Sequence, residues 1–140
     1  MYKDLKTMII IGSTGTGKTR LIKKYIEEII NEDNDIYIID LKRVELFEYK
    51  DNDKVTYIEF MEDIENILNK IEKNKKKKYL FIDEYFEVRI NKDLHELVKK
   101  IIYNRRDYNI DIVLSSQNKN SFCNGMKSKV NTVINLNGYY

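Results

Sequence analysis

The sequence predicts an α/β fold in which a mostly parallel sheet lies between layers of helices. Short apolar stretches rich in isoleucine alternate with segments of helical periodicity along the 140 residues. The first apolar stretch leads through a glycine-rich loop into a helical segment, and a later one ends in two acidic residues. The length fits one domain, residues 1–140, near the minimum size for such a fold.

Six stretches have the length and composition of strands. The stretch 36–40 is apolar on both faces, as strands inside a parallel sheet are, and 55–58 is a short strand candidate. A polar lead-in, residues 1–7, precedes the first of them. In chain order the candidate strands are 8–11, 36–40, 55–58, 79–83, 110–115 and 130–136.

Three longer segments repeat apolar residues every three to four positions. This spacing predicts helices from Lys18 to about residue 30, from 60 to 73, and from 91 to 106. The segments 41–52 and 117–129 are polar and irregular, and the second has room for a helical turn. Strands and helices therefore alternate, as a parallel sheet requires.

The glycine-rich loop is a complete Walker A motif, G-x-x-x-x-G-K-[ST], with the strand before it and the helix after it that the motif requires. Glycines let backbone N–H groups approach a phosphate, and the helix adds its positive amino-terminal end. We expect Lys18 to reach the β- and γ-phosphates of ATP and the Thr19 hydroxyl to bind Mg²⁺. The alternative is a glycine turn in an α/β domain that binds no nucleotide. The predicted nucleotide-binding residues are Gly12, Ser13, Thr14, Gly15, Thr16, Gly17, Lys18 and Thr19.

The stretch YLFIDE, residues 79–84, is an apolar strand that ends in two acids, which is a Walker B pattern. We expect Asp83 to hold Mg²⁺ opposite Thr19, and Glu84 to polarise the water that attacks the γ-phosphate. The alternative is an acidic strand end in solvent. The pairing with a Walker A motif at this distance favours the catalytic interpretation.

Polar residues around the strand 110–115 form a third candidate group. Gln117 would lie between the two Walker motifs, where it can sense the γ-phosphate. Arg105 and Arg106 lie just before this strand, and an arginine from a neighbouring subunit can stabilise transition-state charge. On the residues alone, a helix-end charge or a surface salt bridge is the plainer interpretation of this pair.

The composition limits the other function classes. A net charge of +2 gives no global argument for nucleic acid. The single Cys123 cannot form an internal disulfide, so a reducing cytoplasm is expected. No apolar run is long enough to span a bilayer and no signal peptide pattern is present, so direct membrane insertion is not expected. His95 has no metal-ligand partners nearby in sequence, and we expect it on the surface.

Four segments, in order, resemble the motor core of the FtsK/SpoIIIE DNA translocases, in the FtsK–HerA branch of P-loop ATPases. IIIGSTGTGKT and YLFIDE are similar to the family's Walker motifs, which are generic. More specific are RDYNIDIVLSSQ followed by GMKSKVNTVINL, and YIIDLKRVELFEY. The last carries the family's recurring positions at Asp40, Lys42, Glu45 and Tyr49. The matches span about residues 8–136.

The resemblance implies a RecA-like three-layer sandwich with strand order 5-1-4-3-2. It also implies a Mg²⁺-dependent ATPase that moves or packages double-stranded DNA, independently of sequence, as a homo-oligomeric ring up to a hexamer. Arg106 takes the position of the arginine finger that acts across a subunit boundary, and Gln117 that of the sensor glutamine. Arg105 matches no role. Leu41 replaces a usual proline and Asn118-Lys119 a usual Arg-Pro.

One feature limits the motor interpretation. No membrane anchor or DNA-orienting domain is expected in this chain, so a protein partner that supplies such modules is implied. Candidate DNA contacts are the basic run 75–78, for which a solvated turn is the ordinary interpretation, and the loops 89–92 and 119–129. Two other functions fit the motifs: a non-translocating ATP-binding switch or assembly module, and a small P-loop kinase, for which the chain has little room.

Overall fold

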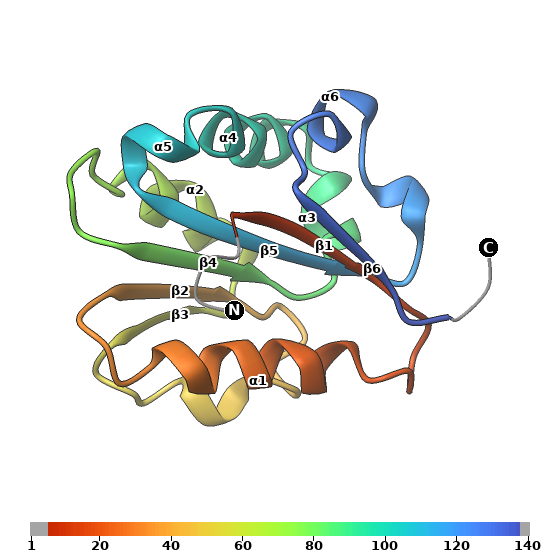
Figure 1. The fold of residues 1–140 in the computed structure, drawn as a ribbon, viewed down its shortest axis with the longest axis horizontal. Coiled ribbons are helices and arrows are strands. Elements are labelled where there is room, and N and C mark those ends of the chain that lie inside the picture. Colours follow the sequence, from red (N-terminus) through yellow and green to blue (C-terminus); the bar gives the residue numbers. More distant parts are fainter. Residues whose placement is uncertain (1–5, 138–140) are drawn as a thin grey trace.

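A computed structural model describes residues 6–137, in which six parallel strands form one sheet with helices on both faces (Figure 1). Most of the predicted lead-in, residues 1–7, lies outside the described residues. The strands are β1 (Thr7–Ile11), β2 (Asp35–Ile39), β3 (Val55–Ile58), β4 (Lys78–Ile82), β5 (Ile110–Ser116) and β6 (Thr132–Asn135). The helices are α1 (Lys18–Ile29), α2 (Met61–Asn69), α3 (Phe86–Arg89), α4 (Lys92–Tyr103), α5 (Arg105–Tyr108) and α6 (Asn124–Lys127), with 3₁₀ turns at η1 (Phe47–Tyr49) and η2 (Lys119–Ser121).

The strands lie in the order β3-β2-β4-β5-β1-β6. Counted in chain order, the five strands other than β3 read 5-1-4-3-2 from the β6 edge, so the predicted order is confirmed, with β3 added beside β2. Every neighbouring pair is parallel, so the sheet is fully parallel. This order separates β1 from β4 by one strand, β5, and places the ends of all three at the same edge of the sheet.

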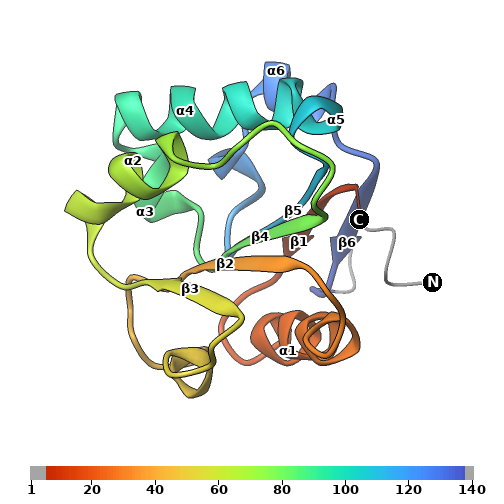
Figure 2. The ribbon, with the colours of Figure 1, turned by 90° about the vertical axis from the view of Figure 1, so that its left-hand side faces the viewer.

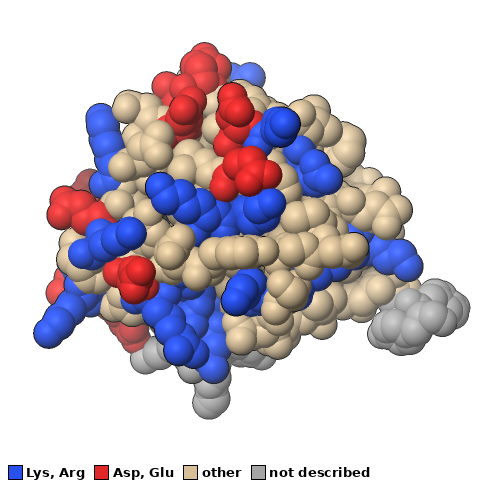
Figure 3. All heavy atoms as spheres, turned by 90° about the horizontal axis from the view of Figure 1, so that it is seen from above, with Lys and Arg blue, Asp and Glu red and all other residues tan. Residues whose placement is uncertain are grey.

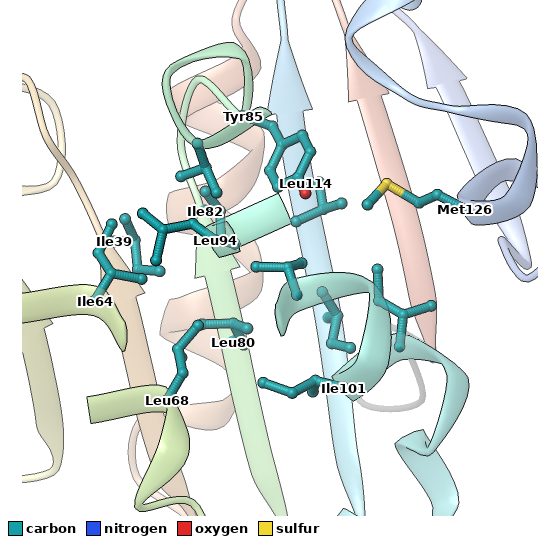
Figure 4. Packing of buried hydrophobic residues seen from close by; sticks show 14 of the residues in the cluster. Ile39, Ile64, Leu68, Leu80, Ile82, Tyr85, Leu94, Ile101, Leu114 and Met126 are labelled. Carbon is teal, nitrogen blue, oxygen red and sulfur yellow. The ribbon is translucent and has the colours of Figure 1, made fainter. Parts of the chain in front are cut away.

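Two apolar cores hold the layers together. Helix α1 and the segment around η1 cover one face of the sheet, and helices α2 to α6 cover the other (Figures 1 and 2). Alternate strand residues point to opposite faces: Ile10 packs with the α1 core and Ile9 with the other. Figure 4 shows how Ile64 and Leu68 of α2 and Leu94 and Ile101 of α4 pack toward strand residues such as Leu80, Ile82 and Leu114.

Three features of the structure differ from the prediction. The helix expected over 91–106 ends at Tyr103, because Asn104 leaves the helical conformation and its side-chain amide donates to the carbonyl of Lys100 at 2.9 Å. Helix α2 ends at Asn69 rather than at residue 73. The four-residue helix α3, which is too short to show helical periodicity, was not predicted at all. Within residues 6–137, none of the helices is both long and apolar enough to cross a bilayer.

Candidate nucleotide site

The carboxyl ends of the central strands surround a cavity of about 310 Å³. The glycine-rich loop after β1, the start of α1, the two acids after β4 and the residue after β5 all contribute to its wall. The lining residues are Ser13, Thr14, Gly15, Gly17, Lys18, Thr19, Arg20, Lys42, Glu45, Asp83, Glu84 and Gln117. Residues separated by about a hundred positions in the sequence therefore meet at one site, as ligand sites at the strand ends of parallel sheets do.

The backbone of the phosphate loop depends on glycine at three positions. Gly15 and Gly17 have φ values of 86° and 97°, in the left-handed region that favours glycine. A Cβ atom on Gly12 would collide with the hydroxyl oxygen of Thr16, which itself donates to the Ser13 carbonyl at 2.7 Å. The Thr16–Ser13 hydrogen bond therefore closes the loop, and the glycines allow its backbone conformation.

A buried ion pair joins the two Walker motifs. Lys18 Nζ lies 3.0 Å from Glu84 Oε1, and the two side chains are only 9% and 13% exposed. Glu84 also has a left-handed φ of 56°, which costs energy for a residue with a Cβ and persists only where neighbours hold it. Its N–H donates to the hydroxyl of Ser115 at 3.1 Å. Glu84 is thus held at both its backbone and its carboxylate.

Asp83 is a buried carboxylate aimed at the same cavity. It is 6% exposed, and its Oδ1 accepts a hydrogen bond from Ser115 Oγ at 2.8 Å. Burial raises the pKa of Asp83, although the Ser115 hydrogen bond acts against this, and the neighbouring charges of Asp40 and Glu84 raise it further. A cation beside Asp83 would offset this cost. Carboxylate and hydroxyl oxygens suit Mg²⁺, so Asp83 and Thr19, which line the same cavity, fit the predicted metal.

The side chain of Gln117 contacts the phosphate loop. Its side-chain Nε2 donates to the Thr14 hydroxyl oxygen at 3.0 Å, across the mouth of the cavity. The residue is exposed and follows directly after β5, between the two Walker motifs, where it was predicted.

Asp40, which the resemblance gave as a recurring family position without a role, is a buried residue that shapes this site. Asp40, fully buried after β2, accepts from the Tyr57 hydroxyl at 2.6 Å and from the Leu46 N–H at 3.2 Å, both at Oδ2. These bonds close the loop that carries Lys42 and Glu45 to the cavity. Among the described residues, no group hydrogen bonds to Asp40 Oδ1. An acid directly after an apolar strand was the signal in the sequence.

Sequence reasoning assigned no role to Ser115. It bonds both Asp83 and the backbone of Glu84, so it positions the whole acidic pair. The sequence predicts only that Ser115 ends a strand, because nothing in the local sequence says which strand lies beside it. The register of β4 and β5, with Ile82 opposite Leu114, places it next to Asp83.

The two arginines lie at the opposite, amino-terminal edge of the sheet. Arg105 Nη1 is 3.1 Å from Asp111 Oδ1, a fully buried carboxylate that Lys77 also contacts at 2.8 Å, so Arg105 has the plainer structural role. Arg106 is exposed and lines a separate cavity of about 600 Å³. Within residues 6–137, no carboxylate lies within salt-bridge distance of Arg106. It does not line the nucleotide cavity of its own chain.

One prediction near the site is wrong. His95 was expected on the surface, but it is 5% exposed, and its Nδ1 lies 2.7 Å from the hydroxyl oxygen of the fully buried Tyr85. Burial lowers the pKa of His95, and the nearby charges of Arg89 and Lys99 lower it further. The polar partner, Tyr85 in the turn before α3, makes burial possible, and no local pattern announces such a partner.

Comparisons with known proteins agree with this fold. A family model described as an AAA domain matches residues 4–136. The pCW3 conjugation coupling protein TcpA, in a monomer form with ATPγS, superposes with a TM-score of 0.79 at 15% identity, over 90% of this chain and 47% of that one. The cytoplasmic domain of EssC gives 0.79 at 13% identity, over 94% and 33%. The cytoplasmic domain of the type VII secretion ATPase EccC from Thermomonospora curvata gives 0.63 at 16% identity, over 82% and 16%.

These similarities cover most of this chain but only part of each solved chain. The chain spans less than half the length of each of the three solved chains. At such identities the likeness establishes the fold. No curated protein matches the sequence.

Proposed function

Because the chain belongs to the AAA domain family, and so carries a nucleotide-binding P-loop, we propose that it is a Mg²⁺-dependent ATPase of the FtsK–HerA type that moves or packages double-stranded DNA. The process would be translocation, conjugative transfer or viral genome packaging. The observation that carries the proposal is the cavity in which the phosphate loop, the acidic pair and Gln117 converge. The proposed setting is the cytoplasm, as a ring of identical subunits.

The proposed reaction begins with an exchange of partners at Lys18. The phosphates of ATP would bind the amides of the loop and draw Lys18 Nζ away from Glu84, to which it is bonded at 3.0 Å. The Glu84 carboxylate is then free to accept a proton. In this scheme ATP binding frees the base, and without nucleotide the ion pair with Lys18 keeps Glu84 from accepting a proton.

Glu84 would then act as the general base. Water attacks the γ-phosphorus, its proton passes to Glu84, and the bond to the β–γ bridging oxygen breaks to release ADP. Ser115 holds both Asp83 and the Glu84 backbone, so it fixes where the base stands. Thr19 and Asp83 would hold Mg²⁺, which neutralises charge on the phosphates. Gln117, already bonded to the phosphate loop, would report whether a γ-phosphate is present.

Arg106 is proposed to complete the site of the next subunit. Arg106 is exposed, lies away from the nucleotide cavity of its own chain, and has no carboxylate partner among the described residues. These features fit an arginine finger that acts in the site of a neighbouring subunit. A ring would place the amino-terminal edge of one sheet against the carboxyl edge of the next. Partner proteins would supply anchoring or DNA-orienting modules.

The similarity to TcpA, a conjugation coupling protein, supports the DNA motor, since it covers 90% of this chain. The similarity to EccC, which is described as a type VII secretion ATPase, supports instead an ATPase of this fold with a role in secretion. A non-translocating switch is therefore the second candidate. The small P-loop kinase remains the weakest candidate, because a chain of 140 residues has little room for the added segments that form a second-substrate pocket.

The test is ATP hydrolysis with and without long double-stranded DNA, at low and moderate salt, with the mass measured by light scattering. A DNA motor should show stimulated hydrolysis together with a higher-order assembly. A monomer that binds ATP and ignores DNA would refute the motor and favour the switch. Phosphoryl transfer to a small acceptor by a monomer would favour the kinase.

Two variants separate the roles of the residues. Glu84→Gln should lower hydrolysis by about 10²- to 10⁴-fold while ATP still binds, whereas Glu87→Gln, on the neighbouring helix, should not. Mixing Arg106→Ala with Glu84→Gln subunits should restore part of the activity, because the intact Glu84 of one then meets the Arg106 of the other. An inactive mixture of variants that still assemble would contradict a finger that acts between subunits.

A further inference from the structure

The basic run 75–78 makes contacts inside the protein that its sequence does not suggest. Lys78 is 2% exposed, and its Nζ donates to the carbonyl of Tyr108 at 2.8 Å and to two further acceptors in the turn before β4. Lys77 Nζ lies 2.8 Å from Oδ1 of Asp111. Two lysines of the run therefore join the start of β4 to α5 and β5, next to the arginine pair.

A buried carboxylate lies at the centre of these contacts. The side chain of Asp111, the second residue of β5, is 0% exposed, and it accepts from Arg105 Nη1 at 3.1 Å as well as from Lys77. The register of β4 and β5, with Tyr79 opposite Asp111, brings the two cations together. Hydrogen bonds between charged groups are short and strong, so this group fixes the position of Arg105.

Helix α5 depends on such contacts because it has only four residues, and a single helical turn is not stable alone. Its first residue, Arg105, is held by the buried ion pair. Its last residue, Tyr108, accepts from Lys78 through its carbonyl. Asn109, which follows at a left-handed φ of 51°, donates its side-chain amide to the carbonyl of Lys75 at 2.7 Å. The segment before β4, which lies beside α5 in Figures 1 and 2, therefore holds this turn at both ends.

Arg106 lies between these two anchors and is exposed. Adjacent residues of a helix point in different directions, so the anchoring of Arg105 against β5 turns Arg106 toward solvent. Figure 3 shows the face of helices α4 to α6, on which basic and acidic side chains are interspersed. The direction of Arg106 follows from the orientation of α5. A displacement of about 1 Å in a catalytic group can lower the rate about 10²-fold, so this orientation matters to an arginine finger.

We propose that Arg105, Asp111 and Lys77 form a mount that positions Arg106 for the site of the neighbouring subunit. The three are positioning residues, since none of them lines the nucleotide cavity. The inference rests on the proposed function, because it takes Arg106 as the finger. The two adjacent arginines then have different roles: Arg105 orients the helix through Asp111, and Arg106 reaches the nucleotide of the neighbour.

The test measures ATP hydrolysis by the whole chain in the presence of long double-stranded DNA. Asp111→Asn keeps the shape of the side chain and removes its charge, and Arg105→Gln alters a partly exposed side chain and so spares the core. Each should lower kcat about 10- to 100-fold with little change in the KM for ATP, because the cavity of the variant itself is intact.

The basic run offers a matched control. Lys77→Gln removes a cation that contacts Asp111, and Lys76→Gln removes its neighbour, whose side chain pairs with Asp33 at 2.9 Å. Lys77→Gln should lower kcat, whereas Lys76→Gln should not. Equal losses in the two variants would contradict a specific role for Lys77.

Mixed assemblies distinguish a misplaced finger from a damaged subunit. Asp111→Asn subunits keep Glu84, so mixing them with Glu84→Gln subunits, which supply a well-placed Arg106, should restore part of the activity. Mixing them with Arg106→Ala subunits should restore none, because neither variant supplies a well-placed finger. A general structural defect would respond alike to both partners. Arg105→Gln goes through the same two mixtures.

The outcomes separate the mount from the proposed function. If Asp111→Asn and Arg105→Gln keep the wild-type kcat while Arg106→Ala loses it, the mount is refuted and the proposed function stands. Restoration of Asp111→Asn by Arg106→Ala, or no restoration by Glu84→Gln, would also refute the mount. If Arg106→Ala and Glu84→Gln subunits assemble together and stay inactive, the proposed finger fails, and the mount fails with it.

Discussion

Replacing Ser115 with alanine tests the arrangement of the acidic pair most directly. Ser115 is fully buried at the end of β5, and one hydroxyl serves two partners: it donates to Asp83 Oδ1 at 2.8 Å and accepts from the Glu84 N–H at 3.1 Å. The substitution removes one oxygen atom and leaves the strand, which pairs through its backbone, in place.

The expected loss of stability follows from these two bonds. A hydrogen bond to a charged group contributes about 1.5–3 kcal/mol, and a neutral one about 1 kcal/mol. Ser115→Ala should therefore lower the free energy of unfolding by about 2–4 kcal/mol. The effect on catalysis has a different origin: without the hydroxyl, the Glu84 N–H loses its acceptor and with it one of the contacts that keep Glu84 at its positive φ, so the proposed base is displaced.

The neighbouring serine provides a matched control. Ser116 is also buried, and its hydroxyl lies 2.7 Å from that of Ser121 and accepts from the Asn118 N–H at 3.3 Å. It touches neither acid. Ser116→Ala should cost about 1 kcal/mol, because its partners are neutral, and should leave the chemical step unchanged.

The assays are urea unfolding and steady-state ATP hydrolysis with ATP affinity measured separately. For Ser115→Ala we expect kcat to fall at least about tenfold, as for a displaced catalytic group, with little change in the Kd for ATP. The reasoning is refuted if Ser115→Ala keeps the kcat of the wild type, or if Ser116→Ala loses kcat to the same extent.

Three further outcomes follow from the structure. Burial raises the pKa of Asp83 in the fold, so its contribution to stability is present at acid pH and is lost as pH rises through the folded pKa. Asp83→Asn should therefore be more stable than wild type at neutral pH and about equal to it at acid pH, which thermal melts across pH would show. The same variant should be inactive in an ATPase assay. Tyr57→Phe removes the 2.6 Å bond to the buried Asp40, which should cost about 1–3 kcal/mol in urea unfolding and raise the KM for ATP more than it lowers kcat, because the loop with Lys42 and Glu45 loosens; an unchanged KM would contradict this. Leu80→Ala, at the centre of the α2–α4 core, should cost about 2–5 kcal/mol, and a loss below about 1 kcal/mol would mean that the packing in Figure 4 is incorrect.

The nucleotide site divides into parts of different predictability. The phosphate loop could be read from the chain because its chemistry is local: glycines, a lysine and a threonine in eight consecutive positions set both the backbone shape and the ligand groups. The acid pair after β4 and the residue after β5 were placed correctly because they end apolar strands, and the ends of parallel strands meet at one edge. The catalytic roles of these residues remain predictions.

Contacts between strands could not be read in the same way. Ser115 meets Asp83, and Lys77 meets Asp111, only because of which strands are neighbours and in which register. Hydrophobic periodicity reports which face of an element is buried, but not what covers it. The strand order itself was obtained by resemblance, and His95 was misplaced because its partner Tyr85 lies on a different element.

By itself, then, the sequence determined an alternating α/β chain, a phosphate-binding loop and the identity of the acids beside it, because each depends on residues that are neighbours in the chain. Only the tertiary structure decided that Lys18 pairs with Glu84 and that Ser115 and Asp40 organise the cavity from buried positions. The physical reason is that these features are contacts between elements, and their energies depend on packing and burial that no local pattern encodes.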